Sequence, residues 1–156
     1  MEKVSQALYQ ALRDDSEATV GIRALLGNTT TSPYNVYHAF IPEAIDLKTA
    51  AGNVGFITYN LISSVAETDI GAPAVRLFQE LYDFTVYHRL LTTVEAVHQR
   101  IKRRLISNRG VTQPTTLAAI YNLKLERLGP HRWDENFNVY FQVASYRAWV
   151  RDDDIH

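Results

Sequence analysis

Cysteine is absent from the 156 residues, which excludes disulfides and thiolate metal sites within this chain and fits a cytoplasmic origin. There is also no run of about 18 apolar residues, so no transmembrane helix is predicted. The first residues, Met1 to Gln6, lack the apolar stretch of a signal peptide. These absences predict a protein that works without a membrane.

An excess of charge of either sign is absent as well. Sixteen Lys and Arg residues balance seventeen Asp and Glu residues, and the formal net charge is −1. There is therefore no global basic field to hold nucleic acid. With 46% hydrophobic residues, a chain of this length can bury a substantial core, and residues 1–156 are predicted to form a single domain.

Recognisable catalytic motifs are absent too. The sequence contains no P-loop, no G-x-G-x-x-G and no G-x-S-x-G. Its five histidines form neither an H-x-H pair nor the H-E-x-x-H spacing of zinc enzymes. No metal, no cofactor and no enzymatic activity are therefore expected. The histidines are His38, His88, His98, His131 and His156.

Two weaker constellations remain. Glu80 and His88 share one face of a predicted strand, but eight residues of strand separate them by about 26 Å. His131, Asp134 and Glu135 cluster in one predicted turn and could bind a metal, although a solvated turn is the favoured interpretation.

Two helices are predicted near the N-terminus. An apolar stripe at i, i+4, i+7 and i+8 indicates an amphipathic helix from Val4 to Arg13. Ser16 is the expected N-cap of a short second helix that continues through Ile22 and ends at Gly27-Asn28.

Alternating patterns predict five strands. Three of them span Val36 to Ile41, Val54 to Ile62 and Arg76 to His88. Leu117 to Leu128 and Phe137 to Val150 form an antiparallel pair, joined by Gly129-Pro130 and a turn from His131 to Asn136. The last strand is apolar on both faces, so helices of the chain can cover one face and a partner the other. Tyr140, Tyr146 and Trp149 on this strand are predicted core or interface residues, rather than platforms for stacked bases.

A strongly basic helix precedes this pair. Thr92 and Glu95 form a capping box, and the helix is expected to run to Ser107. Five cations between Thr92 and Arg109 oppose one carboxylate. They either stabilise the helix C-terminus through its dipole or form a ridge that binds a partner or nucleic acid. The candidate contact residues are Arg100, Lys102, Arg103 and Arg104.

Two long connections, Pro42 to Asn53 and Ser63 to Pro73, are acidic. They are either solvated loops or a functional surface. Four carboxylates oppose the single cation Lys48; these carboxylates belong to Glu43, Asp46, Glu67 and Asp69. The predicted fold class is thus α+β: a mixed, largely antiparallel sheet flanked by an N-terminal helix and one long basic helix.

This order of elements resembles the tail-terminator, or tail-completion, proteins of long-tailed bacteriophages. The resemblance covers most of the chain: the N-terminal helix and its continuation to Leu26, the strands through Tyr82-Asp83-Phe84-Thr85-Val86-Tyr87, the helix Val94 to Leu105, and the closing strands with Tyr140 and Tyr146-Arg147-Ala148.

The resemblance implies a ring-forming, non-enzymatic virion protein, typically a hexamer. Such a ring caps the head-proximal end of the tail tube, stops tube growth and presents a docking surface to the head–tail connector protein. DNA would pass through without specific binding, and the acidic residues Glu43, Asp46, Glu67 and Asp69 could line that channel. The family has no invariant motif, so no interface residue is transferred from it.

Two competing readings stay open. The chain could instead be a head–tail connector or neck protein of a phage. From another class, it could be a small nucleic-acid-binding protein that uses the basic helix from Arg100 to Arg104.

Overall fold

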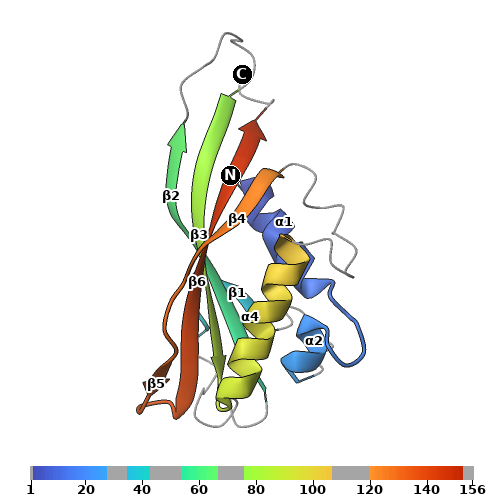
Figure 1. Cartoon of the computed structure of the whole chain (residues 1–156), viewed down its shortest axis with the longest axis vertical. Coiled ribbons are helices and arrows are strands. Elements are labelled where there is room, and N and C mark those ends of the chain that lie inside the picture. Colours follow the sequence, from blue (N-terminus) through green and yellow to red (C-terminus); the bar gives the residue numbers. More distant parts are fainter. Residues whose placement is uncertain (1, 28–34, 43–53, 67–75, 107–119, 153–156) are drawn as a thin grey trace.

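A computed structural model describes residues 2–27, 35–42, 54–66, 76–106 and 120–152. Within these ranges three helices lie on one side of a six-stranded, strongly twisted sheet (Figure 1). The predicted α+β class is therefore confirmed. The elements are α1 (Glu2–Arg13), α2 (Ile22–Leu25), β1 (Val36–His38), β2 (Phe56–Ala66), β3 (Arg76–His88), α4 (Leu91–Leu105), β4 (Ile120–Leu128), β5 (Arg132–Asp134) and β6 (Val139–Asp152).

The sheet has the order β1-β2-β3-β6-β4, and β5 also pairs with β6. Only β1 and β2 run parallel; every other pair is antiparallel. The sheet is thus mixed and largely antiparallel, as predicted. The predicted pairing of the last two long strands is confirmed as the β4–β6 ladder.

β6 is an interior strand of the sheet. On one side it pairs with β3 along its whole length, from Arg76↔Asp152 to His88↔Tyr140. On its other side it pairs first with β5 and then with β4. Because β6 has neighbours on both edges, its position in the sheet explains why its sequence is so rich in large apolar residues.

The core lies between the helices and the sheet face beneath them, called here the inner face. Alternate residues of each long strand point into it, as the period of two requires. Phe84 is fully buried. The centroid of its ring lies 6.1 Å from that of Tyr59 on β2 and 5.4 Å from that of Tyr146 on β6. The apolar stripes of both long helices are buried against this face, including Val4, Leu8, Ala11 and Leu12 of α1 and Val94, Val97, Ile101 and Leu105 of α4.

Apart from shifts of two residues at the start of β2 and at both ends of β6, the described strands differ from prediction in three places. β1 ends at His38 rather than Ile41, because Ala39 adopts a left-handed backbone (φ 69°) that a strand cannot continue. β2 continues to Ala66 through residues predicted as loop, because it pairs with β3 along that stretch. The predicted turn from His131 to Asn136 contains the short strand β5, which pairs with β6.

Both predicted helix caps were wrong. α4 begins at Leu91, without a capping bond from Thr92, and the N–H of Leu90 before it donates to His88 Nδ1 at 2.9 Å. α2 has Gly21 rather than Ser16 at its N-cap position, and the N–H of Ile22 donates to Asp15 Oδ2 at 2.9 Å. In both cases a side chain that precedes the helix accepts an N–H at its start: His88 accepts that of Leu90, and Asp15 accepts that of Ile22.

Candidate functional site

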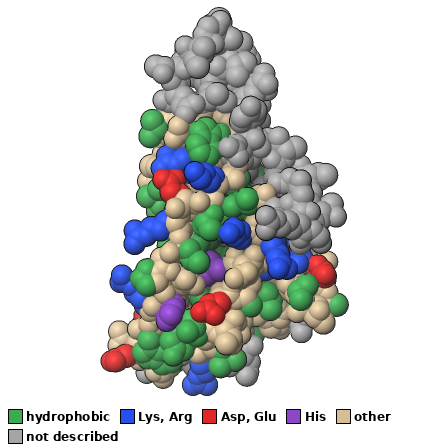
Figure 2. Space-filling model, viewed as in Figure 1, with side chains coloured by type: hydrophobic (Ala, Val, Ile, Leu, Met, Phe, Trp, Pro, Cys, Tyr) green, Lys and Arg blue, Asp and Glu red, His purple; other side chains and the backbone are tan. Residues whose placement is uncertain are grey.

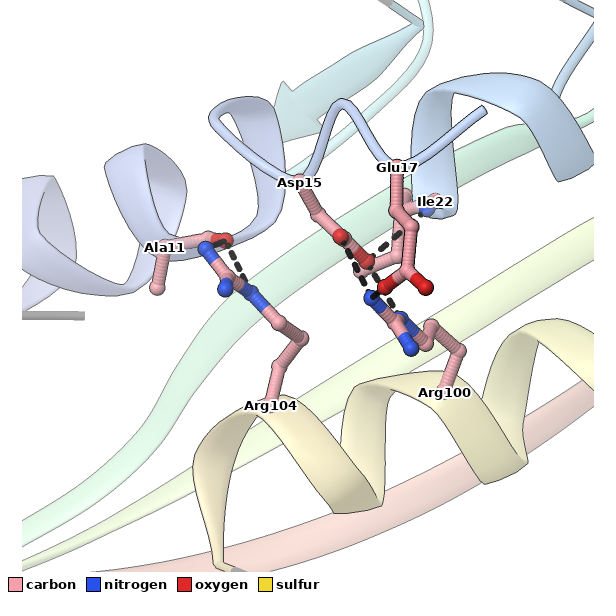
Figure 3. Close-up of polar contacts among 6 residues, drawn as sticks. All are labelled: Ala11, Asp15, Glu17, Ile22, Arg100 and Arg104. Carbon is pink, nitrogen blue, oxygen red and sulfur yellow. Dashed lines mark hydrogen bonds and ion pairs between the residues drawn. The ribbon is translucent and has the colours of Figure 1, made fainter. Parts of the chain in front are cut away.

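The strongest polar constellation joins α4 to the loop between α1 and α2 (Figure 3). Arg100 donates to both carboxylate oxygens of Asp15, at 2.7 and 2.8 Å, and to Glu17 at 2.6 Å. Arg100 and Asp15 are both buried, whereas Glu17 is exposed. We call Asp15, Glu17 and Arg100 the Arg100 cluster. Its centre is the buried, bidentate ion pair of Arg100 and Asp15, and bidentate geometry is the strongest form of guanidinium–carboxylate pairing.

Titration of the Asp15 carboxyl reflects these partners. Burial alone would raise its pKa, but the hydrogen bonds from Arg100 and the Ile22 N–H, with the charges of Arg100 and Arg104, outweigh burial and lower it. The same ion pair raises the pKa of Arg100. The cluster is therefore charged at neutral pH and holds its loop against α4.

Two further arginines bind carbonyl groups at the C-terminal end of α1. Arg104 donates to the Ala11 carbonyl at 3.2 and 3.1 Å (Figure 3), and Arg23 donates to the Arg13 carbonyl at 2.6 Å. The last carbonyls of a helix lack intrahelical partners and carry its negative dipole end, so cations are favoured there. Part of the basic character of α4 thus serves contacts within the chain.

The Arg100 cluster also depends on Gly21. A Cβ added at this residue would lie 2.6 Å from the Glu17 carbonyl oxygen and 2.9 Å from that of Asp15. We expect Gly21→Ala to lower the free energy of unfolding by about 1–3 kcal/mol, because backbone must move. Urea unfolding measures this change; Thr19→Ala, on the exposed part of the same loop, is the control and should stay within about 0.5 kcal/mol of the wild type.

These contacts divide the four predicted cationic contact residues. Arg100 is buried in its ion pair and Arg104 reaches across to α1, whereas Lys102 and Arg103 are exposed. In Figure 2 the basic side chains are spread over this face rather than gathered into one ridge. The prediction that Arg100 contacts a partner at the surface is corrected, because its guanidinium binds carboxylates of its own chain. Sequence reasoning missed this role because Asp15 lies 85 residues away.

The three predicted aromatic contact residues are also separated. Tyr146 is buried on the inner face, so its side chain is part of the core, one of the two roles predicted for it. Tyr140 is half-buried, with its ring 4.7 Å from that of Trp133 on β5. Trp149 is half-buried on the opposite, or outer, face. Trp149 and Tyr140 thus retain surface that a partner can reach.

No described helix covers the outer face (Figure 1). It is less apolar than the alternation suggested, because polar links cross it. Ser145 donates to Asp83 at 2.6 Å, and Arg147 binds both Glu126 and Gln79. One end of this face is closed by the chain itself, in a small cluster of Phe56, Val139, Tyr37, Ile41, Val54 and Tyr87.

A cleft of about 300 Å³ lies beside α4, between this helix and the last strand of the sheet order. We call it the α4–β4 cleft. Its polar wall is one face of α4, and its apolar wall includes Leu125, Leu128 and Tyr146. Leu128 is 52% exposed. The complete lining is Glu95, His98, Gln99, Lys102, Leu125, Leu128, Gln142 and Tyr146.

His98 in this lining is nearly buried. Its Nε2 lies 2.8 Å from the Gln142 carbonyl oxygen and therefore donates, so Nδ1 is an acceptor. Within the described part of the chain, Nδ1 is a buried side-chain atom without a hydrogen-bond partner. His98 therefore keeps one buried acceptor that no described residue satisfies.

Burial lowers the pKa of His98, although the bond to Gln142 acts in the opposite direction. The folded state therefore disfavours the proton that the unfolded chain accepts at about pH 6.5. Its stabilising contribution is complete above that pH and is lost as the pH falls through the folded pKa. We expect the free energy of unfolding to decrease between about pH 7.5 and about pH 5, and His98→Gln to reduce this decrease. Chemical denaturation at both pH values measures it; equal slopes for the two proteins would contradict the assignment.

The described residues contain no group of three His, Asp or Glu side chains placed to hold a metal ion. In the turn that was considered for one, Asp134 Oδ1 accepts the N–H groups of Asn136 and Phe137. Glu80 accepts the Tyr82 hydroxyl at 2.5 Å on a buried part of β3. These carboxylates therefore serve the local structure. Of the helices described, none has the length and apolar character needed to cross a membrane.

The four acidic residues predicted for a channel lie outside the described residues. They are Glu43, Asp46, Glu67 and Asp69.

Comparison with known proteins gives one kind of match. No family model matches the sequence, and no curated protein matches it. Among solved structures, the chain is similar to one from the virion of a native gene transfer agent particle. The two share 18% sequence identity, the match covers 96% of this chain and 95% of that chain, and the TM-score is 0.59. At this identity the similarity shows a common fold, extending over nearly the full length of both chains.

Proposed function

We propose that this chain is a non-enzymatic structural protein of a phage-like virion. The observation that carries the proposal is the common fold with a chain of the gene transfer agent virion over almost all of both chains. The described residues add support, because their strongest polar constellation, the Arg100 cluster, is used for internal structure rather than for chemistry.

Within that class we propose a tail terminator: a homo-oligomeric ring of six subunits, the typical number in the family that the sequence resembles, at the head-proximal end of the tail tube. Its partners would be copies of itself, the tail tube protein and the head–tail connector protein, and DNA would pass through the ring. The element order supports this proposal. So do the two terminal strands of the sheet, β1 and β4, which give each subunit two different edges suited to head-to-tail contacts.

Native mass spectrometry of the purified chain, alone and with tail tube protein, tests the proposal. We expect a closed ring in at least one condition, and electron microscopy should show it at a single end of each tube. Tubes assembled with the protein should also stop growing. Binding to portal-side protein instead of tube protein would assign the chain to the connector. A monomer in both conditions would contradict ring formation.

A DNA-binding titration separates this proposal from the nucleic-acid reading. On α4 the exposed cations Lys102 and Arg103 remain for such a role. We expect no binding to duplex DNA at low salt beyond that of an Arg103→Glu variant. Affinity that is strongly salt-dependent and lost in that variant would instead favour nucleic-acid binding.

A further inference from the structure

Phe40 is the most exposed large hydrophobic side chain among the described residues, with 72% of its surface accessible. It lies directly after β1, at one edge of the sheet. Its position is fixed by backbone bonds: the Ala39 N–H donates to the Tyr59 carbonyl at 2.8 Å, and the Phe40 N–H donates to the His38 carbonyl at 2.9 Å. The fold therefore presents an aromatic ring to solvent, although burying it would be worth about 1.5–3 kcal/mol.

The α4–β4 cleft lies at the other edge of the sheet. β4 ends the strand order that β1 begins. The cleft offers the exposed side chain of Leu128 on its apolar wall, together with Leu125. Its volume of about 300 Å³ exceeds the roughly 150 Å³ that suffices for a benzene ring. One phenylalanine side chain would fit.

We propose that Phe40 of one subunit inserts into the α4–β4 cleft of a second copy of this chain. This inference rests on the proposed ring and names the contact that would build it. Each copy carries one aromatic ring and one cleft on opposite edges, so the contact is head-to-tail. Such heterologous contacts repeat from subunit to subunit and close into a ring when the rotation permits.

Charge favours the same pairing. In the sequence after Phe40, the carboxylates Glu43 and Asp46 precede the first cation, Lys48. The cleft lining carries the exposed cation Lys102 and, nearer the start of α4, the exposed carboxylate Glu95, and a second exposed cation, Arg103, follows Lys102 on α4. Opposite charges flanking an apolar anchor align two surfaces and exclude the reverse pairing. A hydrophobic anchor in a pocket within a charged rim is also the usual anatomy of a protein interface.

Cysteine cross-linking tests the contact at residue level, because the chain has no cysteine of its own. We would prepare Pro42→Cys, at an exposed residue two positions after Phe40 that leaves the Phe40 ring in place, and Gln99→Cys separately; Gln99 is an exposed residue of the cleft lining. Mixed under assembly conditions and treated with a short bismaleimide, the two variants should give a covalent dimer that neither gives alone. Val65→Cys, exposed on β2, should give no such dimer with Gln99→Cys. Equal cross-linking of both pairs would overturn the assignment.

Substitution of Phe40 tests the energetic role. Phe40→Ser should raise the protein concentration needed for half-assembly about 30-fold or more, the effect of losing an interface hot spot. The conservative variant Phe40→Leu should keep assembly within about threefold of the wild type, because an apolar anchor remains. Since Phe40 is exposed, circular dichroism and unfolding of all three proteins should agree, which separates assembly from folding.

The failure of this contact is distinguishable from failure of the proposed function. A wild-type ring that forms without the specific cross-link, and whose assembly is unaffected by Phe40→Ser, would overturn the contact and leave the ring intact. If the wild-type chain stays monomeric alone and with tube protein, both the contact and the ring are overturned.

Discussion

Replacing Arg100 by methionine is expected to cost about 3–5 kcal/mol of unfolding free energy. Methionine has a similar length but no charge, so it leaves the Asp15 carboxylate in a buried position with the Ile22 N–H as its remaining donor from the contacts described above. An uncompensated buried charge is far more costly than a missing pair. Because domains of this size are stable by only about 5–15 kcal/mol, the variant should unfold at clearly lower urea concentration.

The matched control for this prediction is Arg103→Met, on the same helix but exposed, which should stay within about 0.5 kcal/mol of the wild type. Adding Asp15→Asn to Arg100→Met should recover part of the loss, since the asparagine oxygen can still accept the Ile22 N–H without carrying a charge. The coupling energy from this double-mutant cycle measures the ion pair. If Arg100→Met is as stable as Arg103→Met, the cluster does not hold the loop.

The second large effect is expected at Phe84. Phe84→Ala should lower the free energy of unfolding by about 3–5 kcal/mol, through lost apolar burial and the cavity left behind. The ring is fully buried at the middle of the sheet and contacts Tyr59 on one neighbouring strand and Tyr146 on the other. Its removal therefore disturbs the packing of three adjacent strands.

Phe137→Ala is the control for size and residue type. Phe137 is 43% exposed in the turn before β6, so its truncation should cost less than about 1 kcal/mol. Thermal and urea unfolding followed by circular dichroism measure both variants. Similar losses at the two phenylalanines would show that the inner face is not the stabilising core.

Local patterns predicted a large part of this fold. β3 was predicted from Arg76 to His88, the same bounds that the structure shows, because apolar and polar residues alternate throughout it. α1 and α4 were found from their apolar stripes. For β6 the sequence predicted a strand with two apolar faces, and the structure shows that its buried residues recur with a period of two.

What local patterns could not predict depends mainly on tertiary contacts. The two helix caps were misassigned because the N-cap positions are occupied by Leu90 and Gly21, neither of which has a capping side chain, while His88 and Asp15 accept the N–H groups. β5 has only three residues and depends on its pairing with β6. Arg100 binds Asp15, which lies 85 residues earlier in the loop after α1, and no pattern in the sequence links two residues so far apart. For the same reason the cleft beside α4 could not be anticipated.

The placement of β6 has a consequence for biosynthesis. β6 is translated after every other described element, yet it lies inside the sheet and separates β3 from β4 and β5. Until the ribosome has released it, β3 lacks one whole edge of hydrogen bonds, and the helices have an incomplete face to pack on. Contacts this distant in sequence form slowly because a long loop must close first.

Nascent chains should therefore stay incompletely folded until β6 has emerged from the ribosome, with the apolar residues of β3 open to chaperones and to other chains. The proposed contacts between copies could form only after β6 has joined the sheet.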